Sequence, residues 1–216
     1  MKRQRLTMPV VFAAVLFMFV LVAGTLRVYG SGSGRQAATA GIAVLLYLAW
    51  VVLEFCLVSL RELSVPASSG DRGSFEMYAL AQGVTVVAAI LLPGAWDSPV
   101  TSILGLALLA WGCGLRLGAI VELGRFYSRR VRLVENHRVV TTGPYRLVRH
   151  PAYLGTLIGH LGLVLVFGHW LPLLVWAALF VPMVVRRILV EEPLLLQVEG
   201  YAAYAAGRKR LVPGVW

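Results

Sequence analysis

The residues most suited to chemistry stand in one polar stretch, residues 141–155, between two strongly apolar segments. It holds two prolines, two tyrosines, two arginines and a histidine: Pro144, Tyr145, Arg146, Arg149, His150, Pro151 and Tyr153. A loop that only connects two membrane segments does not need so many special side chains. The pattern therefore predicts a site that faces a charged ligand at the membrane surface.

A second charged cluster, at the end of the last apolar segment, contains Arg186, Arg187, Glu191 and Glu192. On a helix, Arg187 and Glu191 are four residues apart and share a face. They could form a simple exposed pair, which contributes only about 0.2–0.5 kcal/mol, and arginines are expected at cytoplasmic helix ends. The same cluster could instead belong to the site of residues 141–155, and both interpretations stay open here.

Metal chemistry has no support in the sequence. The four histidines, His137, His150, His160 and His169, lack metal-ligand spacing on one helix and have no accompanying carboxylate. We expect His160 in mid-helix and His169 at a helix turn to make structural hydrogen bonds. His137 and His150 differ, because each lies in the polar region that carries the arginines. The sequence also lacks a G-x-S-x-G nucleophile elbow.

The composition is that of an integral membrane protein. Of 216 residues, 59% are hydrophobic and 14% are charged, and the mean hydropathy is +0.79. The net charge of +10 is explained by arginine-rich cytoplasmic loops rather than by binding to nucleic acid. Cys56 and Cys113 both lie in apolar segments, so we expect two small core residues and no disulfide framework.

Six apolar segments must position these residues. They cover about residues 9–29, 37–60, 75–92, 99–121, 153–167 and 171–189. The first four have the length of about 20 residues that crosses a bilayer as a helix, and the last two predict a tight helical hairpin. Because lipid excludes unpaired backbone groups, the fold is expected to be all-α. The sequence thus predicts a polytopic membrane protein of about four full transmembrane helices (residues 1–121) and a C-terminal unit (residues 122–216) with a cofactor-binding loop and the hairpin.

The placement of basic residues predicts the orientation. The opposite loops carry only Arg27 and Arg35, whereas the loops on one side carry most of the basic residues: Lys2, Arg3, Arg5, Arg61, Arg72, Arg125, Arg129, Arg130, Arg132, Arg138, Arg146, Arg149, Arg186, Arg187, Arg208, Lys209 and Arg210. By the positive-inside rule, both termini and the two long polar segments are cytoplasmic, in the inner membrane of the cell. Two small-residue patterns, Gly114 with Gly118 and Gly155 with Gly159, predict close contacts between helices.

The C-terminal part of the chain resembles the isoprenylcysteine carboxyl methyltransferase family, whose relatives include phospholipid N-methyltransferases. The resemblance covers about residues 130–216 and rests on His137, Val139, Val140, Gly143, Pro144, Tyr145, Arg149, His150, Pro151, Tyr153, Glu191, Glu192, Gly200, Tyr204 and Pro213. Glu199 departs from it, since the family usually has an aromatic residue before Gly200. The first three segments carry no comparable signal.

The resemblance implies a methyltransferase that binds S-adenosylmethionine at its cytoplasmic face. It implies a cofactor site formed by His137, Arg138, Val139, Val140, Tyr145, His150, Pro151, Ala152, Tyr153 and Glu191. Glu191 would face the cationic cofactor. Arg187 or Arg149 would hold a carboxylate acceptor with a two-pronged guanidinium contact, and are the catalytic candidates. Methyl transfer is an in-line displacement that needs proximity above all.

The expected acceptor is a lipophilic small molecule or lipid, methylated on a carboxyl oxygen. The alternatives are N-methylation of a phospholipid amine, S-methylation of a thiol and, outside enzymes, a small membrane transporter. Glu54 and Arg116 lie within apolar segments and could mark a transport pathway. They also lie near the cytoplasmic ends of those segments, where long side chains reach the interface.

Overall fold

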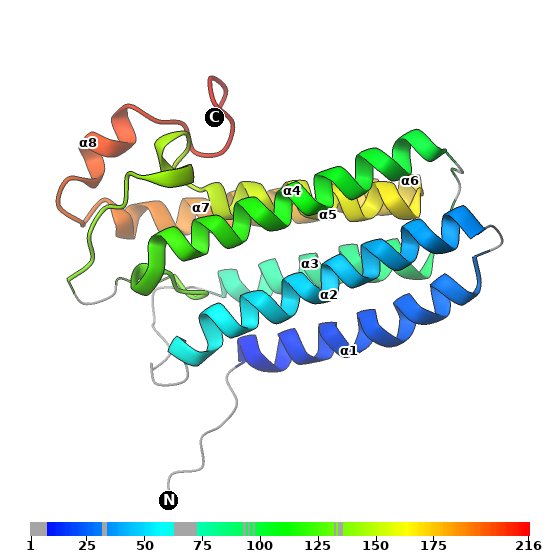
Figure 1. The fold of residues 1–216 in the computed structure, drawn as a ribbon. Helices are drawn as coiled ribbons and strands as arrows, with labels where there is room; N and C mark the ends of the chain where they lie inside the picture. The colour runs from blue at the N-terminus through cyan, green and yellow to red at the C-terminus, as the bar shows by residue number, and fades with distance from the viewer. Residues whose placement is uncertain are drawn as a thin grey trace, which may run out of the picture.

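The chain folds as a bundle of long helices that run side by side (Figure 1). The structure is a computed structural model that describes residues 8–31, 34–62, 73–92, 94, 96, 98–131, 133 and 136–216. Its helices are α1 (Met8–Tyr29), α2 (Gly34–Glu62), α3 (Ser74–Leu91), α4 (Pro99–Leu123), α5 (Pro151–Phe167), α6 (Trp170–Val175), α7 (Val181–Leu195) and α8 (Tyr201–Ala206). Within these ranges the chain forms no β-strand, and the all-α expectation is confirmed.

Five helical stretches are long and apolar enough to cross a membrane: Val11–Tyr29, Gly34–Val58, Ser74–Leu91, Pro99–Phe126 and Trp170–Leu195. The prediction of an integral membrane protein with four full helices and a C-terminal hairpin is confirmed. The first arm of the hairpin, α5, has 17 residues, whereas the second arm is 26 residues long. The second arm runs past the predicted end at residue 189 to Leu195, and the charged Arg187 within it is buried inside the bundle.

The second arm is one continuous helical path with a change of pitch in the middle. Between α6 and α7, residues Trp176–Phe180 form a π-helical turn. Such a turn contains one residue more than the α-helical path would, and often lies beside functional sites. Phe180 is fully buried there, and the Trp176 indole donates a hydrogen bond to the carbonyl of Leu157 on α5 (3.1 Å).

Helices α4 and α5 pack backbone against backbone through glycines. A Cβ placed on Gly112 would lie 2.2 Å from the backbone nitrogen of Gly159, and one on Gly155 would lie 2.7 Å from the carbonyl oxygen of Gly112. The predicted contact of Gly155 and Gly159 is thus confirmed. The prediction for Gly114 and Gly118 is wrong, because both face open space. At about 100° per residue, Gly114 lies almost opposite Gly112 on the helix.

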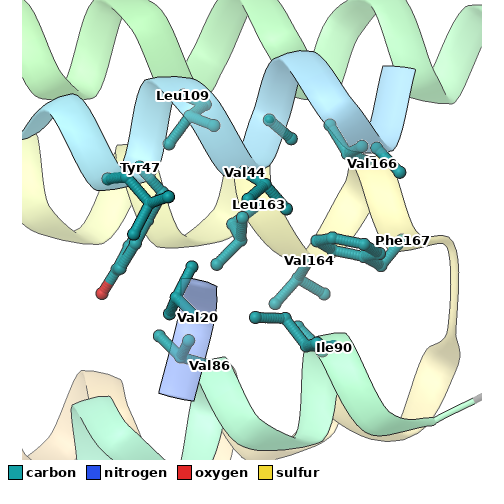
Figure 2. Packing of buried hydrophobic residues seen from close by; sticks show 14 of the residues in the cluster. Val20, Val44, Tyr47, Val86, Ile90, Leu109, Leu163, Val164, Val166 and Phe167 are labelled. Carbon is teal, nitrogen blue, oxygen red and sulfur yellow. The ribbon is translucent and has the colours of Figure 1, made fainter. Parts of the chain in front are cut away.

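The apolar core draws side chains from five helices. Figure 2 shows Val20, Tyr47, Ile90, Leu109 and Leu163 meeting in its centre. Each of these five side chains is at most 1% exposed.

The two cysteines differ in their surroundings. Cys113 belongs to the core, as expected, but Cys56 is exposed on α2 and the expectation for it is wrong. An apolar segment in a membrane protein has a lipid-facing side, so residence in such a segment does not show which residues are in the core.

Two segments far apart in the sequence meet at one end of the bundle (Figure 1). The loop between α4 and α5 pairs with the C-terminal segment through a parallel bridge of Val148 and Lys209. The backbone nitrogens of Arg149 and His150 donate to the carbonyls of Lys209 (2.9 Å) and Arg210 (3.0 Å). The polar regions expected to form the site are therefore in contact.

Candidate functional site

A cavity lies where the loop, the C-terminal segment and the helix ends meet, and its wall has two parts. The C-terminal lining consists of His137, Arg138, Val139, Val140, Tyr145, Arg149, His150, Ala152, Tyr153, Arg187, Glu191, Leu195, Val198, Tyr201 and Tyr204. The N-terminal lining, from α1–α3, consists of Phe12, Ala13, Leu16, Tyr47, Trp50, Val51, Glu54, Phe75, Tyr78, Ala79 and Gln82. Arg116, Leu123 and residues 126–130 connect the two.

The predicted site residues gather around this cavity. All of them except Pro151 form part of its wall. Pro151 is instead buried as the first residue of α5, where the missing backbone N–H and the fixed φ suit a helix start. Glu199, the departure from the family pattern, is exposed beside Gly200, whose φ of 81° turns the chain into α8.

Arg187 and Glu191 are linked through a third residue. The Arg187 Nε donates to the Tyr153 hydroxyl (2.9 Å), which in turn donates to Glu191 Oε2 (2.7 Å). The other guanidinium nitrogens of Arg187 donate to Ser74 Oγ (3.0 Å) and to the carbonyl of Arg129. Arg187 is 3% exposed, so the interpretation as an exposed surface pair is wrong. The three side chains instead form a chain of hydrogen bonds in the cavity wall.

The neighbouring carboxylate, Glu192, is contacted by two arginines and a histidine. Arg149 Nη1 lies 2.8 Å from its Oε1, Arg210 Nε lies 2.7 Å from its Oε2, and His150 Nε2 lies 3.4 Å from its Oε1. Arg149 also donates through Nε to the carbonyl of Arg208 (2.8 Å). This cluster joins the loop, α7 and the C-terminal segment, and it engages Arg149 in structural contacts.

Two buried polar atoms in the C-terminal lining have no hydrogen-bond partner among the described residues: His137 Nδ1 and the Tyr201 hydroxyl. Burial lowers the pKa of His137, an effect that the nearby Glu191 carboxylate partly offsets, so the ring is neutral at pH 7. Burial raises the pKa of Tyr201, which keeps its proton. Since buried polar groups are normally hydrogen-bonded, these atoms indicate a place for a polar ligand.

The tyrosines of the loop and α8 stiffen this part of the wall. The Tyr145 hydroxyl donates to the carbonyl of Ala119 (3.4 Å), and Tyr204 donates to the carbonyl of Tyr145 (2.8 Å). Burial raises the pKa of both phenols, so both remain donors. The resemblance placed Tyr145 in the site but gave Tyr201 no role.

A buried ion pair in the cavity wall was not predicted. Arg116 Nε and Nη2 each lie 2.6 Å from an oxygen of Glu54, and the Trp50 indole also donates to that carboxylate (3.1 Å). Arg116 is 6% exposed, so the interpretation that it reaches the membrane interface is wrong. The signal was present, because opposite charges in two apolar segments are expected to pair inside a membrane protein.

The two histidines outside the loop are structural, as predicted. His160 Nδ1 bonds to the Thr156 carbonyl (2.8 Å), and its Nε2 bonds to the Tyr47 hydroxyl (3.2 Å). His169 accepts a hydrogen bond from the Leu171 backbone nitrogen (3.0 Å) at the start of α6. In the part of the chain that the structure describes, no group of histidines, cysteines and carboxylates is suited to hold a metal ion.

The fold and the cavity define the class of protein. Membrane-crossing helices enclose a cavity whose wall is charged and hydrogen-bonding at one end and largely apolar at the other. Clefts with an apolar wall and a few convergent polar groups are the usual form of small-molecule sites. The chain is an integral membrane protein with a cavity of the kind that binds small molecules.

Comparisons with known proteins identify the family. Residues 100–202 match the phospholipid methyltransferase family. Protein-S-isoprenylcysteine O-methyltransferase B of Arabidopsis thaliana is 32% identical over 136 residues, which are 59% of this chain and 69% of that protein. The A protein of that plant is 33% identical over 130 residues (58% and 66%). The Schizosaccharomyces pombe protein-S-isoprenylcysteine O-methyltransferase is 34% identical over 117 residues (53% and 48%).

The chain belongs to the isoprenylcysteine carboxyl methyltransferase family and is a membrane methyltransferase. The expected family and the expected enzyme class are both confirmed, and the alternative of a small membrane transporter is not supported. A methyltransferase requires a methyl donor, and the cavity described above offers a place for one.

Proposed function

We propose that this enzyme transfers the methyl group of S-adenosylmethionine to the carboxylate of a lipophilic acceptor. One observation carries the proposal. The C-terminal lining holds buried polar atoms without partners beside the Glu191 carboxylate, and it continues into an apolar lining formed by membrane helices. A polar cofactor and an apolar acceptor can thus occupy one cavity from its two ends.

The residues of the C-terminal lining suit the cofactor. Glu191 supplies a negative charge opposite a ligand that carries a sulfonium and an ammonium group, and the neutral His137 ring adds no opposing charge. His137 Nδ1 and the Tyr201 hydroxyl are buried and ready for hydrogen bonds. When bound, S-adenosylmethionine supplies a methyl group on sulfur that a nucleophile can displace. The proposed ligands are His137, Arg138, Val139, Val140, Tyr145, His150, Ala152, Tyr153, Tyr201 and Glu191.

Arg187 is the proposed acceptor-binding residue. Its guanidinium is buried, lies over the rings of Phe75 and Tyr78 (5.7 and 5.6 Å to the centroids), and borders the N-terminal lining. An anionic acceptor is attracted by this charge, and a carboxylate needs no general base before methylation. Arg149, the other candidate, binds Glu192 and we propose that it fastens the C-terminal segment.

The plant and yeast relatives are named for S-isoprenylcysteine, and we propose the same chemistry for the acceptor here, a carboxylate beside a thioether-linked prenyl chain. The acceptor is either a small molecule or the end of a prenylated protein. N-methylation of a phospholipid amine and S-methylation of a thiol are the alternatives. We further propose a division into residues 1–121, which supply the acceptor side, and residues 122–216, which supply the cofactor side.

The proposed orientation follows from the basic loops. We propose that both termini and the loop between α4 and α5 face the cytoplasm, in the inner membrane. Among the basic residues behind this proposal, Lys2, Arg3, Arg5, Arg72 and Arg132 lie outside the described residues. The cofactor then enters from the cytoplasm, while an apolar acceptor enters from the bilayer.

The decisive experiment measures cofactor binding and methyl transfer in parallel. Purified protein in detergent is titrated calorimetrically with S-adenosylmethionine and with its demethylated product, and labelled cofactor is then offered with prenylated cysteines, phospholipid amines and thiols. Absence of heat with both cofactor forms at millimolar concentration contradicts the cofactor proposal. Transfer only to an amine or a thiol contradicts the carboxylate proposal.

Two variants separate the roles of the linked residues. Glu191→Gln should weaken cofactor binding by about 1.5–3 kcal/mol, the usual cost of losing one charge-assisted contact. Arg187→Ala should leave cofactor affinity nearly intact and remove turnover. Near-wild-type values for both variants in both assays would show a purely structural pair, and loss of cofactor binding in both would move Arg187 to the cofactor side.

A further inference from the structure

The tyrosines in the cavity wall differ in where they direct their hydroxyl protons. Tyr153 accepts a hydrogen bond from Arg187 and donates its own proton to Glu191. A guanidinium can only donate and an ionised carboxylate can only accept, so the direction of both bonds is fixed. The hydroxyl proton of Tyr153 is therefore donated to Glu191 and is not available to a ligand.

Tyr47 is also satisfied by the protein. The Nδ1 of His160 faces the Thr156 carbonyl at 2.8 Å and must carry a hydrogen, because a carbonyl oxygen cannot donate. The neutral ring then has an acceptor at Nε2, which receives the Tyr47 proton at 3.2 Å. Gln82 donates to the same hydroxyl at 3.5 Å. Tyr47, like Tyr153, therefore donates its hydroxyl proton to a group of the protein.

The hydroxyl of Tyr127 differs, because it accepts a hydrogen bond from the protein but donates none to it among the described residues. Its hydroxyl receives a hydrogen bond from Arg116 Nη2 (3.1 Å), and since the guanidinium cannot accept, the phenol proton must be directed away from Arg116. Among the described residues no acceptor for this proton is found, and Tyr127 lines the cavity. Its proton is thus available to whatever occupies the cavity.

Arg116 holds this arrangement in place without binding a ligand itself. Its five N–H groups match five acceptors: the two Glu54 oxygens (2.6 Å each), Thr156 Oγ1 (2.7 Å), the Ala152 carbonyl (3.4 Å) and Tyr127. A guanidinium in a fully used, buried pair has little freedom to turn. The position of the Tyr127 oxygen is therefore fixed by α2, α4 and α5 together.

The Tyr127 hydroxyl lies where the two parts of the wall meet. Its ring packs against the cluster of Ala119, Tyr145 and Tyr204 on the C-terminal side. Its oxygen is bonded to Arg116, whose partner Glu54 lies on α2 in the N-terminal lining. In the proposed reaction, this is the boundary that the methyl group crosses between cofactor and acceptor.

We propose that Tyr127 donates a hydrogen bond to an oxygen of the acceptor's carboxylate, and that the Glu54–Arg116 pair is the positioning device that directs this donor. The inference rests on the proposed function and adds the residue that selects the acceptor group. Burial raises the pKa of Tyr127, so the phenol remains a donor at neutral pH. A donor at this place favours an unprotonated oxygen and disfavours an ammonium group, which has only donors of its own.

The test compares two acceptor probes that differ in one group. Binding of an S-prenylated N-acetylcysteine and of its carboxamide is measured with the demethylated cofactor present, so that no turnover occurs. Tyr127→Phe removes one oxygen atom. It should weaken carboxylate binding by about 10- to 100-fold, as for a hydrogen bond to a charged group, and carboxamide binding by several-fold at most. Tyr29→Phe removes a hydroxyl from a side chain that is 85% exposed and should change neither value.

Cofactor affinity and a combined variant complete the test. Tyr127→Phe should keep the affinity for the demethylated cofactor, which also shows that the site is folded. In the Tyr127→Phe background, replacement of Glu54 and Arg116 together by apolar residues, which keeps no unpaired charge, should produce no further loss of the carboxylate-to-carboxamide preference, because the pair acts through Tyr127.

Each remaining outcome overturns the proposal in a distinct way. Equal losses for the two probes would mean a merely structural hydroxyl, and lost cofactor affinity would place Tyr127 on the cofactor. Unchanged binding of both probes would remove Tyr127 from the site. A wild-type protein that binds no cofactor and no acceptor would overturn the proposed function itself, and this inference with it.

Discussion

The two parts of the cavity wall satisfy their polar groups differently. In the N-terminal lining, Glu54 is bonded by Arg116 and Trp50, and Tyr47 by His160. The Tyr78 hydroxyl is the exception in this lining, because it is buried and has no partner among the described residues. In the C-terminal lining, His137 Nδ1 and the Tyr201 hydroxyl are likewise buried without such a partner. The N-terminal lining thus pairs its buried charges within the protein, whereas the C-terminal lining holds most of the buried polar atoms that await a ligand.

The contrast follows from the surroundings of each part. A charge inside a membrane bundle is costly unless it is paired, so Glu54 and Arg116 must satisfy each other. The loop between α4 and α5 lies at the end of the bundle (Figure 1). A polar atom there can exchange water for a ligand at a smaller cost. We therefore expect the two parts to respond differently to mutation, the first mainly in stability and the second mainly in binding.

The largest effect should come from breaking the buried pair. Arg116→Met removes both 2.6 Å contacts of the buried Glu54 carboxylate and leaves it only the Trp50 indole and the more distant Arg129 Nε (4.0 Å). Breaking a buried pair in this way typically costs about 3–5 kcal/mol. Detergent-solubilised variant and wild type are compared by chemical unfolding. Replacing both residues by apolar ones should restore much of the stability, since buried pairs are often replaceable together. An Arg116→Met protein as stable as wild type would show that the pair is not buried as the structure has it.

A somewhat smaller effect is expected where α4 and α5 bring the two parts of the wall together. Gly112→Ala places a methyl group 2.2 Å from the Gly159 nitrogen, so the helices must move apart. Overpacking of this kind costs about 1–3 kcal/mol. Gly114→Ala, two residues away and facing open space, is the matched control and should be neutral or slightly stabilising, because alanine favours a helix. Equal thermal unfolding temperatures for the two variants would contradict the close packing.

The smallest effect concerns the pH dependence of the C-terminal lining. Burial lowers the pKa of His137 below its ordinary value of about 6.5, so the ring gains a proton only in the acid range. As the pH falls there, a cationic ring should repel the cationic cofactor, and affinity should drop by about tenfold or less. The same shift destabilises the folded state as the pH falls below about 6.5, because the unfolded chain binds the proton more readily.

The comparison for this prediction is His137→Asn, which cannot gain the charge. Calorimetric affinities between pH 5 and pH 8 should vary less with pH for the variant than for the wild type. Parallel curves for the two proteins would show that His137 does not face the cofactor.

The sequence was a good guide wherever a pattern is local. Apolar segments predicted the helices. The site residues predicted between His137 and Tyr153 line one cavity, and Pro151 is the exception among them. What local patterns could not supply is the partner of each charge. Arg149 and Arg187 look equivalent in sequence, but Arg149 is bonded to Glu192, whereas Arg187 is joined to the cavity wall through Tyr153.

The glycines illustrate the same limit. Gly114 and Gly118 have the spacing of a helix contact, as Gly155 and Gly159 do, yet only the second pair is in contact. Spacing states that two residues share a face, and it does not state what that face meets. The Glu54–Arg116 pair was not predicted for a related reason. Glu54 lies on α2, outside the region of family resemblance, and its partner Arg116 is 62 residues away in the sequence.

The π-helical turn Trp176–Phe180 determines which face the following helix turns toward the cavity. One additional residue in a helix rotates everything that follows it by about 100° relative to everything before. The orientation of α7, with Arg187 and Glu191, relative to α6 is thus set by a single residue. Deletion of one residue in this turn would keep the helix but would turn Arg187 and Glu191 away from the cavity.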